Sequence, residues 1–90
     1  MVRVEKTGET IYRVTVDESG STSTHTVELD GDYQRKLSGD RETGEQLVRR
    51  SFEFLLAREP KESILSRFHL SVIARYFPDF EKAITLKKDG

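Results

Sequence analysis

Residues 47–77 of the chain, LVRRSFEFLLAREPKESILSRFHLSVIARYF, contain four of its five phenylalanines and its clearest helical periodicity. At 100° per residue, the apolar side chains from Leu47 to Leu56 fall on one side of a helix, whereas Arg49, Arg50 and Glu53 fall on the other. This pattern predicts an amphipathic helix that must bury one face against another part of the chain, so this stretch decides the fold.

Two prolines divide the remainder of this stretch. Pro60 ends the first helix, because proline has no N–H to donate and disfavours helical geometry at the preceding residue. The same proline suits the first turn of a second helix. Ser71 is the expected N-cap of a third short helix, which Pro78 ends. The apolar side chains expected on the inner faces of these two helices are Ile64, Leu65, Phe68, Val72, Ile73, Tyr76 and Phe77.

The N-terminal third of the chain has the alternation of β-strands. Residues 2–5, 10–16 and 22–29 alternate apolar and polar side chains and are rich in β-branched types. They predict an antiparallel meander with one apolar face, which only the later helices can cover. The side chains expected on that face of the second and third strands are Tyr12, Val14, Val16, His25, Val27 and Leu29.

The predicted fold class is therefore α+β, with an antiparallel meander of two or three strands followed by three to four short helices packed on one sheet face. The chain is expected to form a single domain, residues 1–90, with the meander in 1–30, the helical layer in 43–84 and a tail in 85–90. Thr43 and Gln46 fit a capping box at the start of the helical layer. Residues 31–38 are compatible with either a helical turn or a packed loop.

Length and composition restrict the classes of function. A chain of 90 residues with 34% apolar residues has a small core, so any site is expected to be a surface groove or an interface. The absence of cysteine excludes disulfides and thiol chemistry. No apolar run has the length of a signal peptide core or a membrane helix, so a cytoplasmic location without membrane association is expected. The net charge of −1 argues against a general coat for nucleic acid.

The motifs that suggest chemistry are incomplete. Residues 39–44 have the glycine spacing of a phosphate-binding loop, but Glu45 and Gln46 follow where that loop needs Lys and Ser or Thr. Residues 30–41 begin like a calcium loop, but Arg35 stands at the position of the required glycine and no glutamate stands at the twelfth position. His25 and His69 are the only histidines, and a zinc site would need distant carboxylates as well. We therefore expect no catalytic residue, no metal site, no cofactor and no enzyme activity.

Residues 61–77 are typical of a helix, a three-residue turn and a second helix, which is the frame of a DNA-reading helix-turn-helix. The outward face of the second helix would offer only one cation and no Asn or Gln to read a base. Nucleic-acid binding is therefore the alternative function. Its candidate residues are Arg49, Arg58, Lys61, Arg67 and Arg75, with Arg41 and Arg50 as further cations.

The favoured function is protein binding, either to another protein or to a second copy of the chain. Phe54 lies just off the main apolar stripe of the first helix and widens the apolar arc to about half of the circumference. An arc of that width either leaves an exposed patch for a partner or is covered by the later helices. Phe54 and Arg50 are the residues that we assign to a partner-binding surface.

Residues 51–78, SFEFLLAREPKESILSRFHLSVIARYFP, also resemble a known group of sequences. They are similar to a family of short uncharacterised prokaryotic proteins that share F-x-F-L-L-x-R-E-P, then I-L, then I-x-x-Y-F-P. The resemblance covers about a third of the chain. It implies a free-standing domain from a bacterium or archaeon, and it implies no activity.

Overall fold

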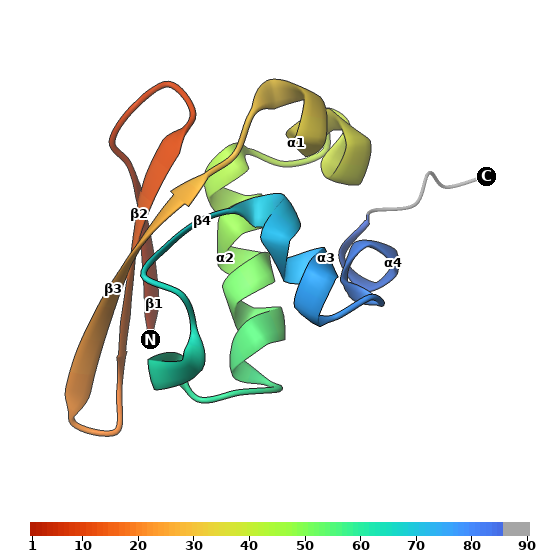
Figure 1. Cartoon of the computed structure of the whole chain (residues 1–90). Coiled ribbons are helices and arrows are strands. Elements are labelled where there is room, and N and C mark those ends of the chain that lie inside the picture. Colours follow the sequence, from red (N-terminus) through yellow and green to blue (C-terminus); the bar gives the residue numbers. More distant parts are fainter. Residues whose placement is uncertain (86–90) are drawn as a thin grey trace.

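The computed structural model describes residues 1–85, which form one four-stranded mixed sheet with helices packed on it (Figure 1). The α+β class predicted from the sequence is confirmed. The strands lie in the order β1-β2-β3-β4, and the first three form the predicted antiparallel meander. The fourth strand runs parallel to β3. The strand bounds are β1 Val2–Lys6, β2 Ile11–Glu18, β3 Ser21–Glu28 and β4 Arg67–His69.

Four α-helices and two short 3-10 turns make up the rest of the described chain. Residues 31–38, which the sequence left open between helix and loop, form the first helix. The bounds are α1 Gly31–Ser38, α2 Gly44–Leu56, η1 Lys61–Ser63, η2 Leu70–Val72, α3 Ile73–Tyr76 and α4 Phe80–Ile84. Among residues 1–85, none of these helices has both the length and the apolar character needed to cross a membrane.

Local side-chain caps set where the two longer helices begin. Asp30 accepts a hydrogen bond from the Tyr33 amide, which satisfies a free N–H in the first turn of α1. Thr43 and Gln46 form the predicted capping box at the start of α2. The Thr43 amide donates to Gln46 Oε1 at 2.8 Å, and the Gln46 amide donates to Thr43 Oγ1 at 3.1 Å.

The inner face of the sheet has the predicted register. Val14 lies opposite His25 and Tyr12 lies opposite Val27, and all four side chains are buried. Both ring nitrogens of His25 have partners. Nε2 lies 2.8 Å from the Ser23 hydroxyl, and Nδ1 lies 2.8 Å from the Leu65 carbonyl. His25, which the sequence placed on the inner face of the sheet, is therefore a core histidine hydrogen-bonded to a neighbouring hydroxyl.

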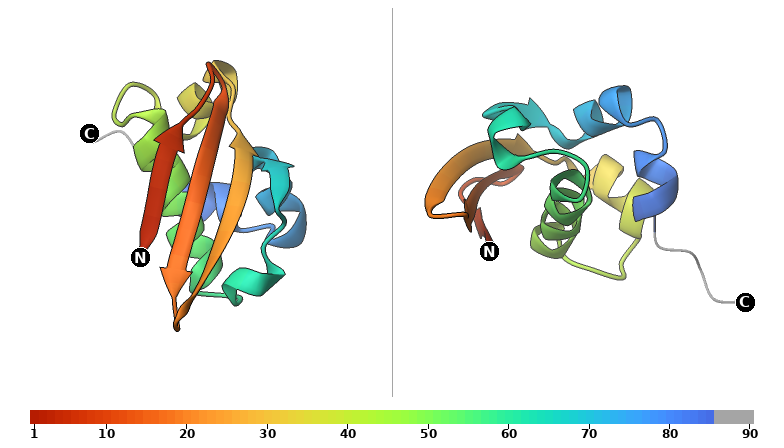
Figure 2. Two further views of the ribbon diagram at one scale, coloured as in Figure 1. Left: turned by 90° about the vertical axis from the view of Figure 1, so that its left-hand side faces the viewer. Right: turned by 90° about the horizontal axis from the view of Figure 1, so that it is seen from below.

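Helix α2 lies between the sheet and the other helices, so two of its sides are buried (Figure 2). On the sheet side, the Phe52 ring contacts His25 and Phe68, with centroid distances of 5.4 and 6.0 Å. On the far side, the Phe54 ring meets Phe77 and Phe80 edge-on at 5.9 and 5.2 Å. Phe54 is only 8% exposed. Of the two outcomes that the wide apolar arc left open, the structure has the second: in the described chain the segments after residue 69 cover Phe54, and it forms no exposed patch.

The second helix predicted after Pro60 is wrong. Residues 61–63 form only the turn η1, and the chain is then extended through β4. The edge of β3 explains this difference. Its backbone groups would be unpaired without β4, and they are satisfied by Arg67–His69 and by the Ser66 carbonyl, which accepts from the Thr26 amide at 2.8 Å. The helix-turn-helix frame at 61–77 is therefore not formed.

The third predicted helix is divided and has a different cap: the turn η2 begins at Leu70, before the expected start, and α3 follows from Ile73. His69, rather than Ser71, is the cap of the turn η2, since its Nδ1 accepts from the Ser71 amide at 3.1 Å. Ile73 is buried as predicted, but Tyr76 is 67% exposed. With α3 only four residues long, its inward side has room for few side chains, and Tyr76 lies outside the core.

Helix α4 forms the end of the helical layer that the sequence predicted over residues 43–84. The predicted tail, residues 85–90, lies outside the described residues except for Thr85. The Thr85 amide and hydroxyl both donate to the Glu81 carbonyl, so Thr85 closes α4 and belongs to the fold.

Gly44 has a packing role, and this generates a stability prediction. A Cβ atom at Gly44 would lie 2.0 Å from the buried Tyr12 hydroxyl oxygen. We expect Gly44→Ala to lower the free energy of unfolding by roughly 1–3 kcal/mol, because Tyr12 or the start of α2 must shift. Urea denaturation followed by circular dichroism measures this loss.

Gly31→Ala is the matched control, because Gly31 is also the first residue of its helix. A Cβ there would have as its nearest neighbour the flexible end of Arg35, at 3.3 Å. We expect Gly31→Ala to be neutral or stabilising, since alanine is the better helix former. Equal stability of the two variants would contradict the role assigned to Gly44.

Candidate functional site: an apolar groove

An apolar groove lies where the end of α2, the extended segment before β4 and helix α3 meet. Its volume is about 380 Å³, within the range of ligand and peptide sites. The floor includes the buried side chains Leu55, Ile64 and Phe68. The complete lining is Leu55, Glu59, Ser63, Ile64, Leu65, Phe68, Val72, Ile73, Tyr76 and Phe77.

Two side chains of this lining are unusually exposed for their type. Leu65 is 46% exposed and Tyr76 is 67% exposed. Within residues 1–85, the only other large apolar side chain of comparable exposure is Met1, at the N-terminus. Single exposed apolar residues are ordinary, but apolar residues gathered around a concave surface indicate an interaction site.

Glu59 is the one charged residue of the groove lining, which is otherwise formed mostly by apolar residues. The residue is half-buried, and its amide donates to the Leu55 carbonyl at 2.9 Å as α2 ends. Over the described part of the chain, no ion pair or side-chain hydrogen bond involves the Glu59 carboxylate. A carboxylate without a partner in the fold can accept a cation or N–H donors that a ligand brings.

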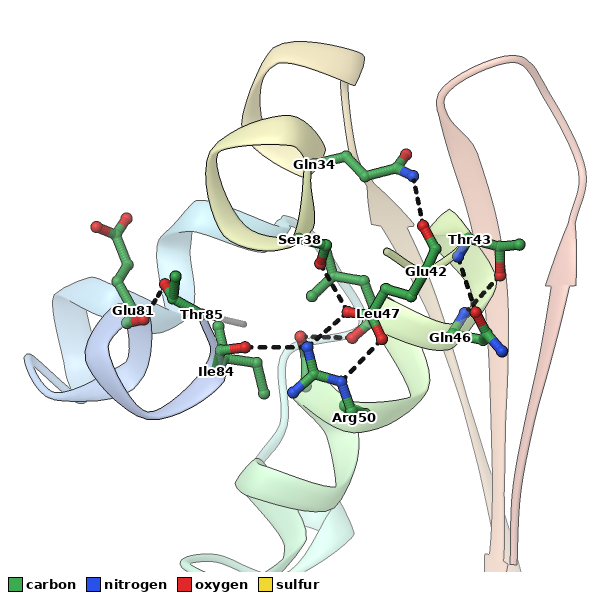
Figure 3. Close-up of polar contacts among 11 residues, drawn as sticks. Gln34, Ser38, Glu42, Thr43, Gln46, Leu47, Arg50, Glu81, Ile84 and Thr85 are labelled. Carbon is green, nitrogen blue, oxygen red and sulfur yellow. Dashed lines mark hydrogen bonds and ion pairs between the residues drawn. The ribbon is translucent and has the colours of Figure 1, made fainter. Parts of the chain in front are cut away.

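Arg50, which the sequence assigned to partner binding, lies elsewhere and is used inside the fold (Figure 3). Its Nε and Nη2 donate to both Glu42 carboxylate oxygens at 2.9 and 2.5 Å. Nη2 also donates to the Ile84 carbonyl at 2.9 Å, and the Ser38 hydroxyl donates to Glu42 at 2.6 Å. Arg50 therefore joins α2 to α4 and to the end of α1.

The Glu42 carboxylate is mostly buried, and its surroundings change its acidity. Burial alone would raise the pKa of Glu42. The hydrogen bonds from Arg50 and Ser38, together with the charge of Arg50, outweigh burial and hold the pKa of Glu42 below its ordinary value. The ionised carboxylate is therefore the form that the folded protein stabilises.

Three of the five cations proposed for nucleic-acid binding also serve the fold. The Arg49 Nη1 donates to the Val2 carbonyl at 2.6 Å. The Arg58 guanidinium lies 3.5 Å from the Phe54 ring centroid and donates to the Phe54 carbonyl at 3.1 Å. Lys61 is only 4% exposed, and its Nζ lies 2.8 Å from Glu62. These three side chains therefore make contacts within the fold.

The remaining two cations, Arg67 and Arg75, are exposed but lie on different elements, β4 and α3. Neither of them has an ion-pair partner among residues 1–85. Arg67 lines a smaller hollow with Glu28 and His69, whereas Arg75 directly precedes the exposed Tyr76. The five candidates therefore do not form a single basic stripe.

A serine, a histidine and an aspartate form a hydrogen-bonded chain at the start of η2. The Ser71 hydroxyl lies 2.8 Å from His69 Nδ1, and His69 Nε2 lies 2.7 Å from Asp30 Oδ1. The hydrogen bond from His69 is the main reason that the pKa of Asp30 is lowered. However, the same Nδ1 accepts the Ser71 amide, which is the geometry of a helix cap. We interpret the chain as a structural link between η2 and the cap of α1.

Metal binding finds no support in the described residues. Across residues 1–85, no three His, Asp or Glu side chains are grouped as a metal site requires. His25 and His69 make separate hydrogen bonds to Ser23 and Asp30, respectively.

The residues that the sequence reasoning missed are Glu59, Leu65 and Tyr76. Leu65 and Tyr76 were assigned to the inner faces of predicted helices, and Glu59 was assigned no role. The family resemblance includes the sequence patterns Glu59-Pro60 and Tyr76-Phe77-Pro78. These patterns contain Glu59 and Tyr76, but they do not indicate that the two residues line the same groove.

Comparisons with protein-family models, with curated proteins and with solved structures give no match to this chain. The resemblance of residues 51–78 therefore stays a prediction, and the geometry of the groove is the basis for any functional assignment.

The Glu42 network generates a pH-dependent stability prediction. Because the pKa of Glu42 is lowered in the folded state, its ionised form stabilises the fold at neutral pH. This contribution is lost as the pH falls from the ordinary value of 4.5 through the lower folded value. We expect Glu42→Gln to cost about 1–3 kcal/mol at neutral pH, and this difference from wild type should shrink in acid. Urea titrations at several pH values measure it.

Glu53→Gln is the control for the Glu42 prediction, because Glu53 is an exposed carboxylate on the same helix. We expect its effect to stay within about 0.5 kcal/mol at every pH. A Glu42→Gln penalty that did not change between neutral and acidic pH would show that the charge is not its source.

The positions of the cations generate a prediction about nucleic acid. With three of the five candidate cations used inside the fold, we expect no binding to random duplex DNA tighter than about 100 μM at physiological salt. Fluorescence anisotropy with labelled duplex at low and moderate salt measures this affinity. Micromolar binding with a salt dependence of several released ions would contradict the prediction and favour the nucleic-acid alternative.

Proposed function

We propose that this chain is a protein-interaction domain and that the groove between α2, β4 and α3 is its binding surface. The observation that carries the proposal is the grouping of Leu65 and Tyr76 around one apolar hollow. Burying an exposed large apolar side chain contributes roughly 1.5–3 kcal/mol, so keeping both in water is costly without a partner. A binding surface gives these two residues a role that the fold does not.

The chemistry of the groove defines its occupant. The occupant is a polypeptide surface with a large apolar or aromatic side chain that enters the hollow. It also carries an arginine or lysine beside that side chain, because Glu59 offers a half-buried carboxylate without a partner in the described structure. An ion pair formed there is partly shielded from water and contributes more than an exposed one.

Two observations favour protein binding over the other classes of function. The candidate cations for nucleic-acid binding are mostly engaged in contacts within the fold. The Ser71–His69–Asp30 chain has the geometry of a helix cap. Protein binding through an apolar surface requires only the residues that line the groove.

Short peptides of defined sequence test this function. Each labelled peptide contains one Phe or Leu to enter the groove. One series has an Arg beside this residue, and a matched series has a Glu at the same position. We expect the Arg series to bind more tightly, with chemical-shift changes at Leu65, Phe68, Val72 and Tyr76. Tyr76→Ala should weaken binding by about tenfold or more, because the exposed ring supplies apolar area.

A charge reversal supplies the specificity control. Glu59→Arg should reverse the preference, so that the Glu peptides bind more tightly than the Arg peptides. Glu53→Arg is the matched control, because Glu53 lies on α2 outside the groove lining. This control variant should keep the preference for the Arg peptides. Equal binding of both series to wild type, or chemical-shift changes away from the groove, would contradict the proposed site.

A further inference from the structure

The groove has a projecting aromatic residue at its own edge. Tyr76 ends α3 and is 67% exposed, although Ile73 of the same helix is buried in the lining. One continuous surface therefore presents both a hollow and a side chain of the kind that fills such a hollow.

The charges of this surface are paired in the same way. Glu59 lies in the hollow, and Arg75 directly precedes the projecting Tyr76. Within the described chain, neither side chain has an ion-pair partner. The lining of the hollow thus carries an anion, and the residue before the projecting Tyr76 is an exposed cation.

A twofold interface between identical chains requires such self-complementarity. In it, residue i of one chain contacts residue j of its partner, and j contacts i in return. We propose that the occupant of the groove is a second copy of this chain. Tyr76 of each protomer enters the groove of the other, and Arg75 of each pairs with the partner's Glu59. This inference rests on the proposed function, that the groove binds protein.

The size of the surface sets the expected strength of this dimer. A stable interface buries about 800 Å² on each partner and involves about 20–30 residues a side. The groove lining and Arg75 together amount to 11 residues. Because this is about half of a standard interface, we expect a weak and reversible dimer with a Kd of about 10–100 μM. Its formation should therefore depend on protein concentration.

Sedimentation equilibrium over about 5 μM to 1 mM tests the dimer, with circular dichroism to show that each variant folds. We expect wild type to pass from monomer to dimer in this range. Tyr76→Ala should weaken the dimer at least about tenfold, because each interface loses two aromatic contacts. Glu59→Arg and Arg75→Glu should each weaken it by a similar factor, since each replaces two attractions with two repulsions. Glu53→Arg and Arg3→Glu are the controls, and they should dimerise as wild type does.

Mixing the two charge variants is the decisive measurement. In a heterodimer of Glu59→Arg with Arg75→Glu, both intermolecular pairs have opposite charges again. The mixture should therefore dimerise at concentrations at which neither variant does so alone. No recovery in the mixture, or wild-type dimerisation of Tyr76→Ala, would overturn the proposed interface.

The outcomes also separate this inference from the proposed function. If wild type stays monomeric up to about 1 mM while the Arg peptides bind the groove, the second copy is excluded and protein binding stands. If neither dimer nor peptide binding is observed, both proposals fail.

Discussion

The fold depends on the burial of α2 from two sides. A helix that covers only a sheet needs one apolar stripe, but α2 carries Phe52 towards the sheet and Phe54 towards α3 and α4. Both rings must be buried at once, which requires a second layer of structure beyond the helix. The short segments after residue 69 supply this layer. Because none of them is long enough to be stable in water alone, their packing on α2 holds them in place.

The polar contacts strengthen the same arrangement along α2. From the middle of the helix, Arg50 pairs with Glu42, which precedes α2, and this mostly buried ion pair links α2 to α1 and α4. At its end, Arg58 lies over the Phe54 ring and pairs with Asp79 at 3.6 Å. Arg50 and Arg58 are thus used in contacts within the fold. The requirements of packing therefore determine which charges remain for binding.

The groove is a consequence of how the edge of β3 is satisfied. Because residues 67–69 pair with β3 as a strand, the preceding segment is extended, and Ile64 and Leu65 point to different environments. In a helix both would have faced the core. The extended path leaves Leu65 beside the hollow that α3 and the end of α2 complete. The surface on which the proposed function rests therefore arises from a backbone requirement of the sheet.

The sequence by itself determined the α+β class, the meander and its inner face, and the start of α2. These features depend on alternation, periodicity and capping among residues close in the chain, as with Thr43 and Gln46. Only the tertiary structure decided that residues 67–69 form a strand, that Phe54 is buried and that Glu59 and Tyr76 line one groove. Each of these results depends on partners distant in sequence. Thr26 pairs with Arg67 across about 40 positions, and a local pattern contains no information about such a partner.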